Sequence, residues 1–133
     1  MTAIYIIYNA DGTTVGKLKY AYTKLRSSAS DSPCSACDLT HNGLNLTETA
    51  EWTTTKSKIA AEVHQLHRDE LSDELKHFIA EQNLKLPVVL GQKSKDAPLK
   101  LLLDRQELGV LSKDHGHFLE VLQRYSLEKG IKI

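Results

Sequence analysis

The hydrophobic and polar positions along this chain follow two periods, one typical of buried strands and the other of amphipathic helices. Residues 3–8 are an unbroken run of alanine, isoleucine and tyrosine, which predicts a strand buried on both faces at the centre of a sheet. After a turn at 9–12, apolar side chains recur at helical spacing and share one face: Val15, Leu18, Tyr22 and Leu25. This spacing predicts an amphipathic helix that ends near Arg26.

The second half of the chain repeats this combination. Apolar residues within 69–83 again share one helical face: Leu71, Leu75, Phe78 and Ile79. Residues 84–91 have the composition of a strand with Pro87 near its entry, and residues 99–104 that of its antiparallel neighbour. A final helix is predicted from a last apolar face: Phe118, Val121, Leu122 and Tyr125.

The segment between the two halves is the least regular part of the chain. Residues 27–33 are small and polar, which predicts an exposed loop, and a single helical turn is expected at 36–40. Trp52 could anchor a helix within 44–58, although the three threonines that follow it are poor helix formers. Residues 59–66 have no clean period, and we predict a strand there because of the helix and hairpin that follow.

These elements predict one domain of the α/β class over residues 1–133. Right-handed crossovers would place helices on both faces of a mixed four-stranded sheet. Residues 27–58 would form an insertion after the first helix, and this insertion carries both cysteines. A chain of this length can bury one core of ordinary size.

The charge balance argues against two classes of partner. Lysine and arginine together number 17, as do aspartate and glutamate, so the formal net charge is zero. No overall field would draw the protein to nucleic acid or to an anionic membrane. The short apolar run at the N-terminus lacks a basic lead, and no later run is long enough to span a bilayer. We therefore expect a cytoplasmic protein with no nucleic-acid and no membrane partner.

Cys34 and Cys37 are the only cysteines, and their spacing suits two chemistries. As a redox dithiol, Cys34 would be the attacking thiolate at the start of a helical turn and Cys37 the resolving thiol. As ligands, both could hold zinc with His41, which lies four residues after Cys37, and with His67 as the candidate fourth ligand. A third possibility is that both are inert small side chains in the core.

Polar residues follow the two strands that are predicted to be parallel. Asn9 and Asp11 come after the first strand, and residues 67–70 (His, Arg, Asp, Glu) come after the second. Ligands of open α/β sheets bind at the carboxyl ends of parallel strands, so this edge is a candidate site with Pro87 close by. The structural alternative is that Asp69 caps a helix and that Asn9 and Asp11 form a turn.

The element order, with Pro87 before an apolar strand that opens a hairpin, resembles the thioredoxin-like fold, in which such a proline is typically cis. This resemblance implies that Pro87 forms a wall of the site. Residues 8–12, 34–41 and 66–70 are also similar to segments of small bacterial proteins of unestablished function. That second similarity implies no activity.

The position of the cysteines departs from the thioredoxin pattern. Thioredoxin-type oxidoreductases carry the two cysteines directly after the first core strand, where this chain has residues 9–12. Here they come one helix later, so a standard thioredoxin activity does not follow from the resemblance. Three hypotheses remain: thiol–disulfide exchange with a thiol-containing protein or small molecule, a zinc-binding module, and an interaction domain without chemistry.

Overall fold

The computed structural model of the chain describes residues 2–9, 34–41 and 48–133. The helix predicted at 13–26 and the loop predicted at 27–33 lie outside these residues. The described elements follow one another as β1 (Ala3–Tyr8), α2 (Ser35–His41), α3 (Ala50–Ser57), β2 (Glu62–His67), α4 (Asp73–Glu81), β3 (Val88–Gln92), β4 (Lys100–Leu103), α5 (Arg105–Leu111) and α6 (His115–Glu128).

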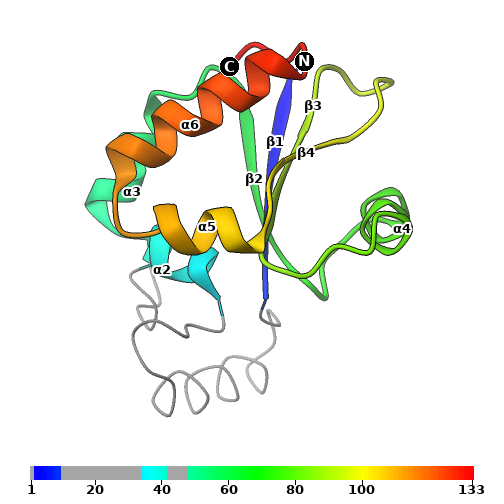
Figure 1. Ribbon diagram of the computed structural model, residues 1–133, viewed down its shortest axis with the longest axis horizontal. Helices are drawn as coiled ribbons and strands as arrows, with labels where there is room; N and C mark the ends of the chain where they lie inside the picture. Colours follow the sequence, from blue (N-terminus) through cyan, green and yellow to red (C-terminus); the bar gives the residue numbers. More distant parts are fainter. Residues whose placement is uncertain (1, 10–33, 42–47) are drawn as a thin grey trace.

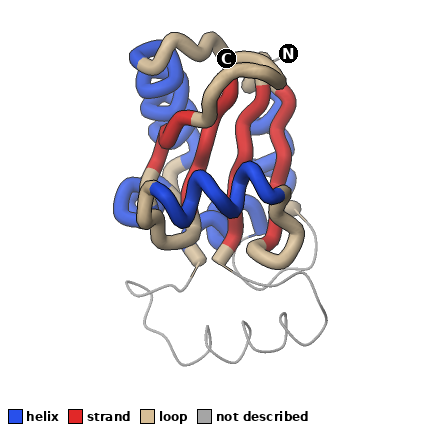
Figure 2. The backbone as a smooth tube through the Cα atoms, turned by 90° about the vertical axis from the view of Figure 1, so that its right-hand side faces the viewer, coloured by secondary structure: helices blue, strands red, loops and turns tan. Residues whose placement is uncertain are grey.

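The four strands form one mixed sheet in the order β2-β1-β3-β4 (Figure 2). β1 is parallel to β2 and antiparallel to β3, and β3 and β4 form an antiparallel pair. At the end of β1, Tyr8 pairs with His67 of β2, and Ile7 pairs with Val88 of β3. The prediction of a mixed four-stranded sheet is confirmed.

Helices cover both faces of this sheet, as predicted. Among the helices that the structure describes, α4 lies on one face and the others lie on the opposite face (Figure 1). Alternate side chains of β1 enter two separate cores, because successive residues of a strand point to opposite faces. Ile4, Ile6 and Tyr8 pack among α2, α5 and α6, whereas Ile7 packs with Leu75 of α4.

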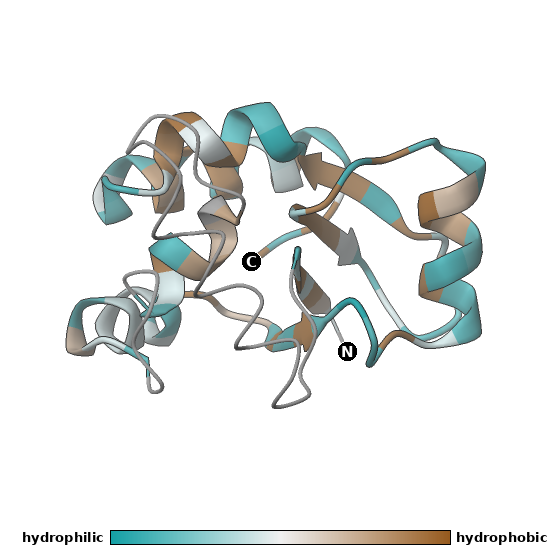
Figure 3. Cartoon of the chain, turned by 90° about the horizontal axis from the view of Figure 1, so that it is seen from below, coloured by the Kyte–Doolittle hydropathy of each residue, from teal (hydrophilic) through white to brown (hydrophobic). Residues whose placement is uncertain are grey.

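α4 and α6 are amphipathic, and capping side chains explain where α3, α4 and α6 begin. Figure 3 shows α4 with hydrophobic residues toward the strands and hydrophilic residues on its outer side. The side chains of Thr49, Ser72 and Asp114 accept hydrogen bonds from the first turns of α3, α4 and α6. None of the helices in the described part of the chain has the length and apolar character needed to cross a membrane.

Four predictions about elements need correction. β3 begins at Val88 and not at residue 84, because Leu84 still donates a hydrogen bond to the end of α4. The cap of α4 is Ser72, so Asp69 does not cap it, and the helix begins later than residue 69. β2 begins at Glu62 and not at residue 59, because the preceding residues complete the end of α3. The short helix α5 was not predicted, although Asp104 and Glu107 form a reciprocal capping box at its start.

The peptide bond between Leu86 and Pro87 is cis. Pro87 is buried and directly precedes β3. Since Val88 pairs with Ile7, one further step along each strand makes Tyr8 and Pro87 neighbours at the same edge of the sheet.

Candidate functional site

Cys34 and Cys37 form a disulfide at the start of α2. Their Cα atoms are 5.2 Å apart, and the backbone amide of Cys37 donates a hydrogen bond of 3.2 Å to Sγ of Cys34. Cys34 is fully buried and Cys37 is 8% exposed. The two sulfurs therefore lie within bonding distance, and the amide of Cys37 would also stabilise a Cys34 thiolate after reduction.

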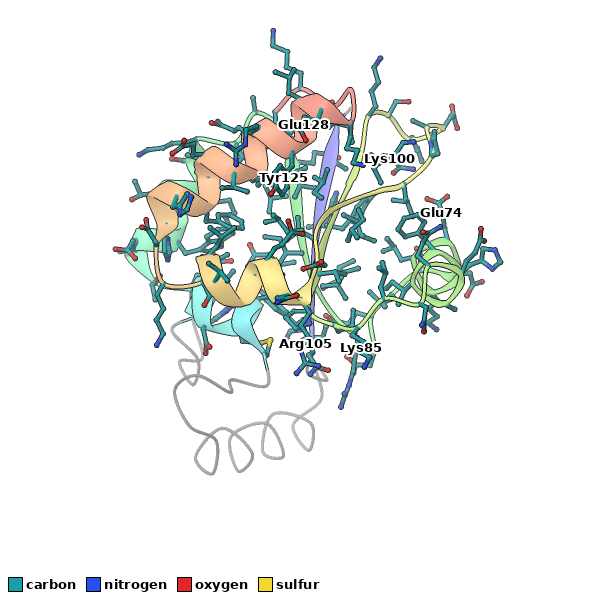
Figure 4. All side chains as sticks on the ribbon, viewed as in Figure 1. Glu74, Lys85, Lys100, Arg105, Tyr125 and Glu128 are labelled. Carbon is teal, nitrogen blue, oxygen red and sulfur yellow. A yellow bond between two sulfur atoms is a disulfide. The ribbon has the colours of Figure 1, made fainter. Side chains whose placement is uncertain are left out.

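The disulfide lies beside the carboxyl end of β1. Cys34, Cys37 and Leu39 belong to the same core cluster as Tyr8, the last residue of β1. Figure 4 shows the yellow disulfide bond at the start of α2, close to the label of Arg105 at the start of α5. α2 contacts both β1 and α5. The insertion therefore returns the cysteines to the edge of the sheet from which the chain left.

A hydrogen bond of 2.9 Å between Tyr8 and Thr40 holds α2 against the end of β1. Thr40 Oγ1 also lies 3.1 Å from the carbonyl oxygen of Ala36 and 2.7 Å from Nδ1 of His41. A carbonyl can only accept, so Thr40 gives its single proton to Ala36, and Tyr8 and His41 both donate to Thr40. Tyr8 is 2% exposed and Thr40 is fully buried, so the bonds of Thr40 to Tyr8 and to Ala36 form out of contact with water.

Gln65 of β2 extends these bonds toward α3. Its Nε2 donates to the Tyr8 hydroxyl over 2.8 Å, and its Oε1 accepts from Lys56 at 3.0 Å and from the Trp52 indole at 3.4 Å. Lys56 also forms an ion pair of 2.8 Å with Glu48. We call Tyr8, Thr40 and Gln65 the tyrosine clamp, because their three side chains join β1, α2 and β2.

The two histidines named as candidate ligands pack against the same aromatic ring. The ring centroids of His41 and His67 lie 6.0 Å and 5.1 Å from that of Tyr8. Each uses its Nδ1 atom for a hydrogen bond of 2.7 Å, His41 to Thr40 and His67 to Glu70. His41 in α2 and His67 at the end of β2 therefore contact the same ring, that of Tyr8.

The zinc hypothesis gains no support from this arrangement. Both candidate cysteine ligands, Cys34 and Cys37, are joined in the disulfide, which leaves no thiolate to bind a metal. Within residues 2–9, 34–41 and 48–133, no three His, Cys, Asp or Glu side chains converge so that they could hold a metal ion. For the reduced protein, zinc binding by these cysteines with His41 and His67 stays a prediction.

The polar cluster expected at this edge is assembled only in part. Arg68 donates to Asn9 over 3.5 Å, and Glu70 accepts from both the backbone and the ring of His67. The hydrogen bond from the His67 backbone, followed by that from its ring, lowers the pKa of Glu70. Asp11 lies outside the described residues. Residues 67–70 therefore form a turn that positions His67 beside Tyr8.

The tyrosine clamp was not foreseen from the sequence. Tyr8 was counted only as a strand residue, and Thr40 and Gln65 were given no role. Their partners lie 32 and 57 residues apart along the chain, so no local spacing could indicate them. The sequence signal was weak: Tyr8 places a hydroxyl at the last position of a mostly aliphatic strand, but Tyr5 places another within it.

We expect Tyr8 to ionise at a higher pH than an exposed tyrosine in an alkaline titration. Desolvation raises the pKa of Tyr8, and the hydrogen bonds to Thr40 and Gln65 offset this only in part. A phenol with a raised pKa in the folded state contributes stability below its unfolded pKa of about 10, and this contribution is lost as the pH rises beyond that value.

We therefore expect the urea midpoint to fall more steeply above about pH 10 in the wild type than in Tyr8→Phe. Near-ultraviolet absorbance of tyrosinate measures the titration directly. Identical pH dependence of the two proteins would contradict a raised pKa at this position.

The site thus consists of a buried disulfide, the tyrosine clamp that holds its helix, and two histidines on the clamp's aromatic ring. All of it lies at the edge where β1 ends and β3 begins. Comparison of the chain with protein-family models, with curated proteins and with solved structures found no match.

Proposed function

We propose that this chain is a cytoplasmic thioredoxin-like protein that exchanges thiols and disulfides through Cys34 and Cys37. The observation that carries the proposal is the disulfide between these residues at the end of β1. Two cysteines separated by two residues in a reducing compartment are expected to stay as thiols unless they take part in redox turnover.

The arrangement of the sheet supports the thioredoxin-like part of the proposal. The resemblance rested on a mixed sheet with helices on both faces and on a proline at the entry to a hairpin strand, and each of these features is present. The insertion also brings the cysteines back to the end of β1. This is where thioredoxin-type oxidoreductases carry their cysteines, although here they come later in the sequence.

The proposed reaction transfers two electrons from the Cys34–Cys37 dithiol to a partner disulfide. In the reduced protein, the Cys34 thiolate attacks a partner disulfide, forms a mixed disulfide and releases one partner thiolate, which takes up a proton. Cys37 then loses its proton and attacks Sγ of Cys34, so that the Cys34–Cys37 disulfide forms and the second partner thiol leaves. The amide of Cys37 supports the first step, because it donates to the sulfur that must carry the negative charge.

Burial of the site adds a condition to this reaction. Cys34 is fully buried and Cys37 nearly so, so a partner sulfur reaches them only when the start of α2 opens locally. The tyrosine clamp opposes that opening, since it ties α2 to β1 and β2. We expect the clamp to control how fast the site exchanges with its partner.

The test is reduction of insulin disulfides in the presence of dithiothreitol. The wild-type protein should accelerate the reaction above the rate with dithiothreitol alone, and Cys34→Ser should abolish this increment. To trap the intermediate, Cys37→Ser is reduced, freed of dithiothreitol and then mixed with insulin. It should accumulate a mixed disulfide, detected by non-reducing electrophoresis, because the resolving thiol is missing. Circular dichroism confirms that both variants fold.

Other outcomes have defined consequences. A mixed disulfide in Cys34→Ser but not in Cys37→Ser would make Cys37 the attacking residue. If the wild-type protein does not reduce insulin faster than dithiothreitol alone, the proposal is wrong, and the hypothesis of an interaction domain without redox chemistry is favoured. Elemental analysis of the reduced, tag-free protein decides for zinc if one equivalent is bound and is lost in His41→Ala.

A further inference from the structure

An open groove lies on the face of the sheet that α4 covers, away from the disulfide. Its walls are α4 and the loop that joins β3 to β4, and its volume is about 410 Å³. The lining side chains come from Glu74, His77, Phe78, Glu81, Asp96, Ala97, Pro98 and Leu99. The disulfide packs in the core on the other face of the sheet, so the groove is not part of the thiol site.

The two walls of the groove are held by one buried amide. Gln92 is 4% exposed, and its Nε2 donates to Glu74 Oε1 on α4 at 3.2 Å and to the carbonyl of Ala97 in the loop at 2.8 Å. Its Oε1 accepts from the Tyr5 hydroxyl at 3.0 Å, which fixes the orientation of the amide. Figure 4 labels Glu74 on the side of α4 that faces this loop. The groove is therefore preformed and does not depend on a ligand to shape it.

The groove combines an apolar floor with an acidic rim. Phe78, Pro98 and Leu99 supply apolar surface, and Leu99 is 8% exposed. Glu74, Glu81 and Asp96 supply three carboxylates, and no lysine or arginine is among the lining residues. Among the described residues that line the groove, His77 is the one basic side chain, and its Nε2 lies 2.9 Å from Glu81. This negative rim is a local feature, because the whole chain has no net charge.

We propose that this groove binds a short cationic segment of a partner protein, with one apolar side chain on Phe78, Pro98 and Leu99. Lysine or arginine residues on either side of that apolar side chain would pair with the exposed carboxylates of Glu81 and Asp96. Charge complementarity of this kind selects the partner and speeds its association more than it adds affinity. Such a segment would dock without covering α2 and its disulfide, which pack on the other face of the sheet.

Fluorescence anisotropy with three labelled pentapeptides tests the proposal. The probes are Lys-Lys-Phe-Lys-Lys, Lys-Lys-Ser-Lys-Lys and Glu-Glu-Phe-Glu-Glu, added to the full-length protein at low salt. We expect binding of the first peptide, weaker binding of the second because it lacks the apolar anchor, and none of the third. Raising the salt should weaken the first complex, since exposed ion pairs are screened.

Two double variants with equal charge change locate the binding. Glu81→Gln with Asp96→Asn should weaken the first complex about five- to tenfold, which corresponds to two exposed ion pairs. Glu120→Gln with Glu128→Gln removes two exposed carboxylates from α6 and should change the affinity by less than about twofold. Glu74 is kept in both, because Gln92 holds it.

Three results would overturn the proposal: equal effects of the two double variants, equal binding of the phenylalanine and serine peptides, or no binding of any peptide. Light scattering tests whether the groove binds a second copy of this chain. Self-association of the wild type that is lost in the Glu81→Gln, Asp96→Asn variant would assign the groove to a second copy of the chain instead. Insulin reduction by that variant should match the wild type, so this test and that of the thiol site fail independently.

Discussion

Replacing Trp52 by alanine is expected to lower the free energy of unfolding by about 3–5 kcal/mol, the usual cost of removing a large buried aromatic side chain. Trp52 is fully buried in α3 and packs edge to face against Phe118 of α6, with ring centroids 5.8 Å apart. Its indole also donates to Gln65, so the substitution takes one donor from the tyrosine clamp. Urea denaturation followed by far-ultraviolet circular dichroism measures the loss.

Two controls separate packing from the hydrogen bond. Trp52→Phe keeps most of the apolar contact and loses the indole donor, so it should cost clearly less than the alanine variant. Val110→Ala, at a side chain that is 76% exposed, should stay within about 0.5 kcal/mol of the wild type. A loss below about 1 kcal/mol for Trp52→Ala would show that α3 does not anchor this half of the core.

The sheet could be predicted from the sequence because its strands carry local signals. Residues 3–8 are apolar at every position, and this is what a strand with cores on both faces requires. β2 was harder to recognise, since it lies at the edge of the sheet and has only two apolar residues, Val63 and Leu66, among four polar ones. α5 was missed although Asp104 and Glu107 have the spacing of a capping box, a signal that was present in the sequence.

The helix α3 shows a limit of propensity arguments. The threonines after Trp52 are poor helix formers, yet Thr53 and Thr55 donate to backbone carbonyls four residues earlier. Thr55 also contacts His115 of α6 at 3.1 Å, so packing against another helix overrides the local preference. That contact joins residues 60 positions apart, which no local pattern can reveal.

The sequence likewise predicted one part of the candidate site and not the other. The spacing of Cys34 and Cys37 was enough to predict that they act as a pair, and the structure joins them. It was not enough to locate them, because the residues that bring α2 to β1 are a tyrosine and a threonine whose contact depends on the finished fold. His41 and His67 were singled out as ligands, but their Nδ1 atoms serve Thr40 and Glu70 and their rings enclose Tyr8.

Breaking the tyrosine clamp is expected to destabilise α2 and to make the disulfide easier to reach. Tyr8→Phe leaves Gln65 and Thr40 each without one buried partner, and Thr40→Val leaves the Tyr8 hydroxyl without its acceptor. Each substitution should cost about 1–3 kcal/mol. Because both remove the same bond, the double variant should cost less than their sum, with a coupling of about 0.5–3 kcal/mol.

The same variants should expose the disulfide more often under native conditions. If α2 must open before a thiol can attack, each 1.4 kcal/mol taken from the opening free energy speeds reduction about tenfold. Tyr5→Phe is the matched control, since it removes a hydroxyl from the other face of β1, where the partner is Gln92. Stopped-flow reduction by dithiothreitol without denaturant should therefore be faster in Tyr8→Phe and Thr40→Val but not in Tyr5→Phe. Equal rates in all four proteins would show that the thiol reaches the disulfide without opening of α2, and the clamp would then have only a structural role.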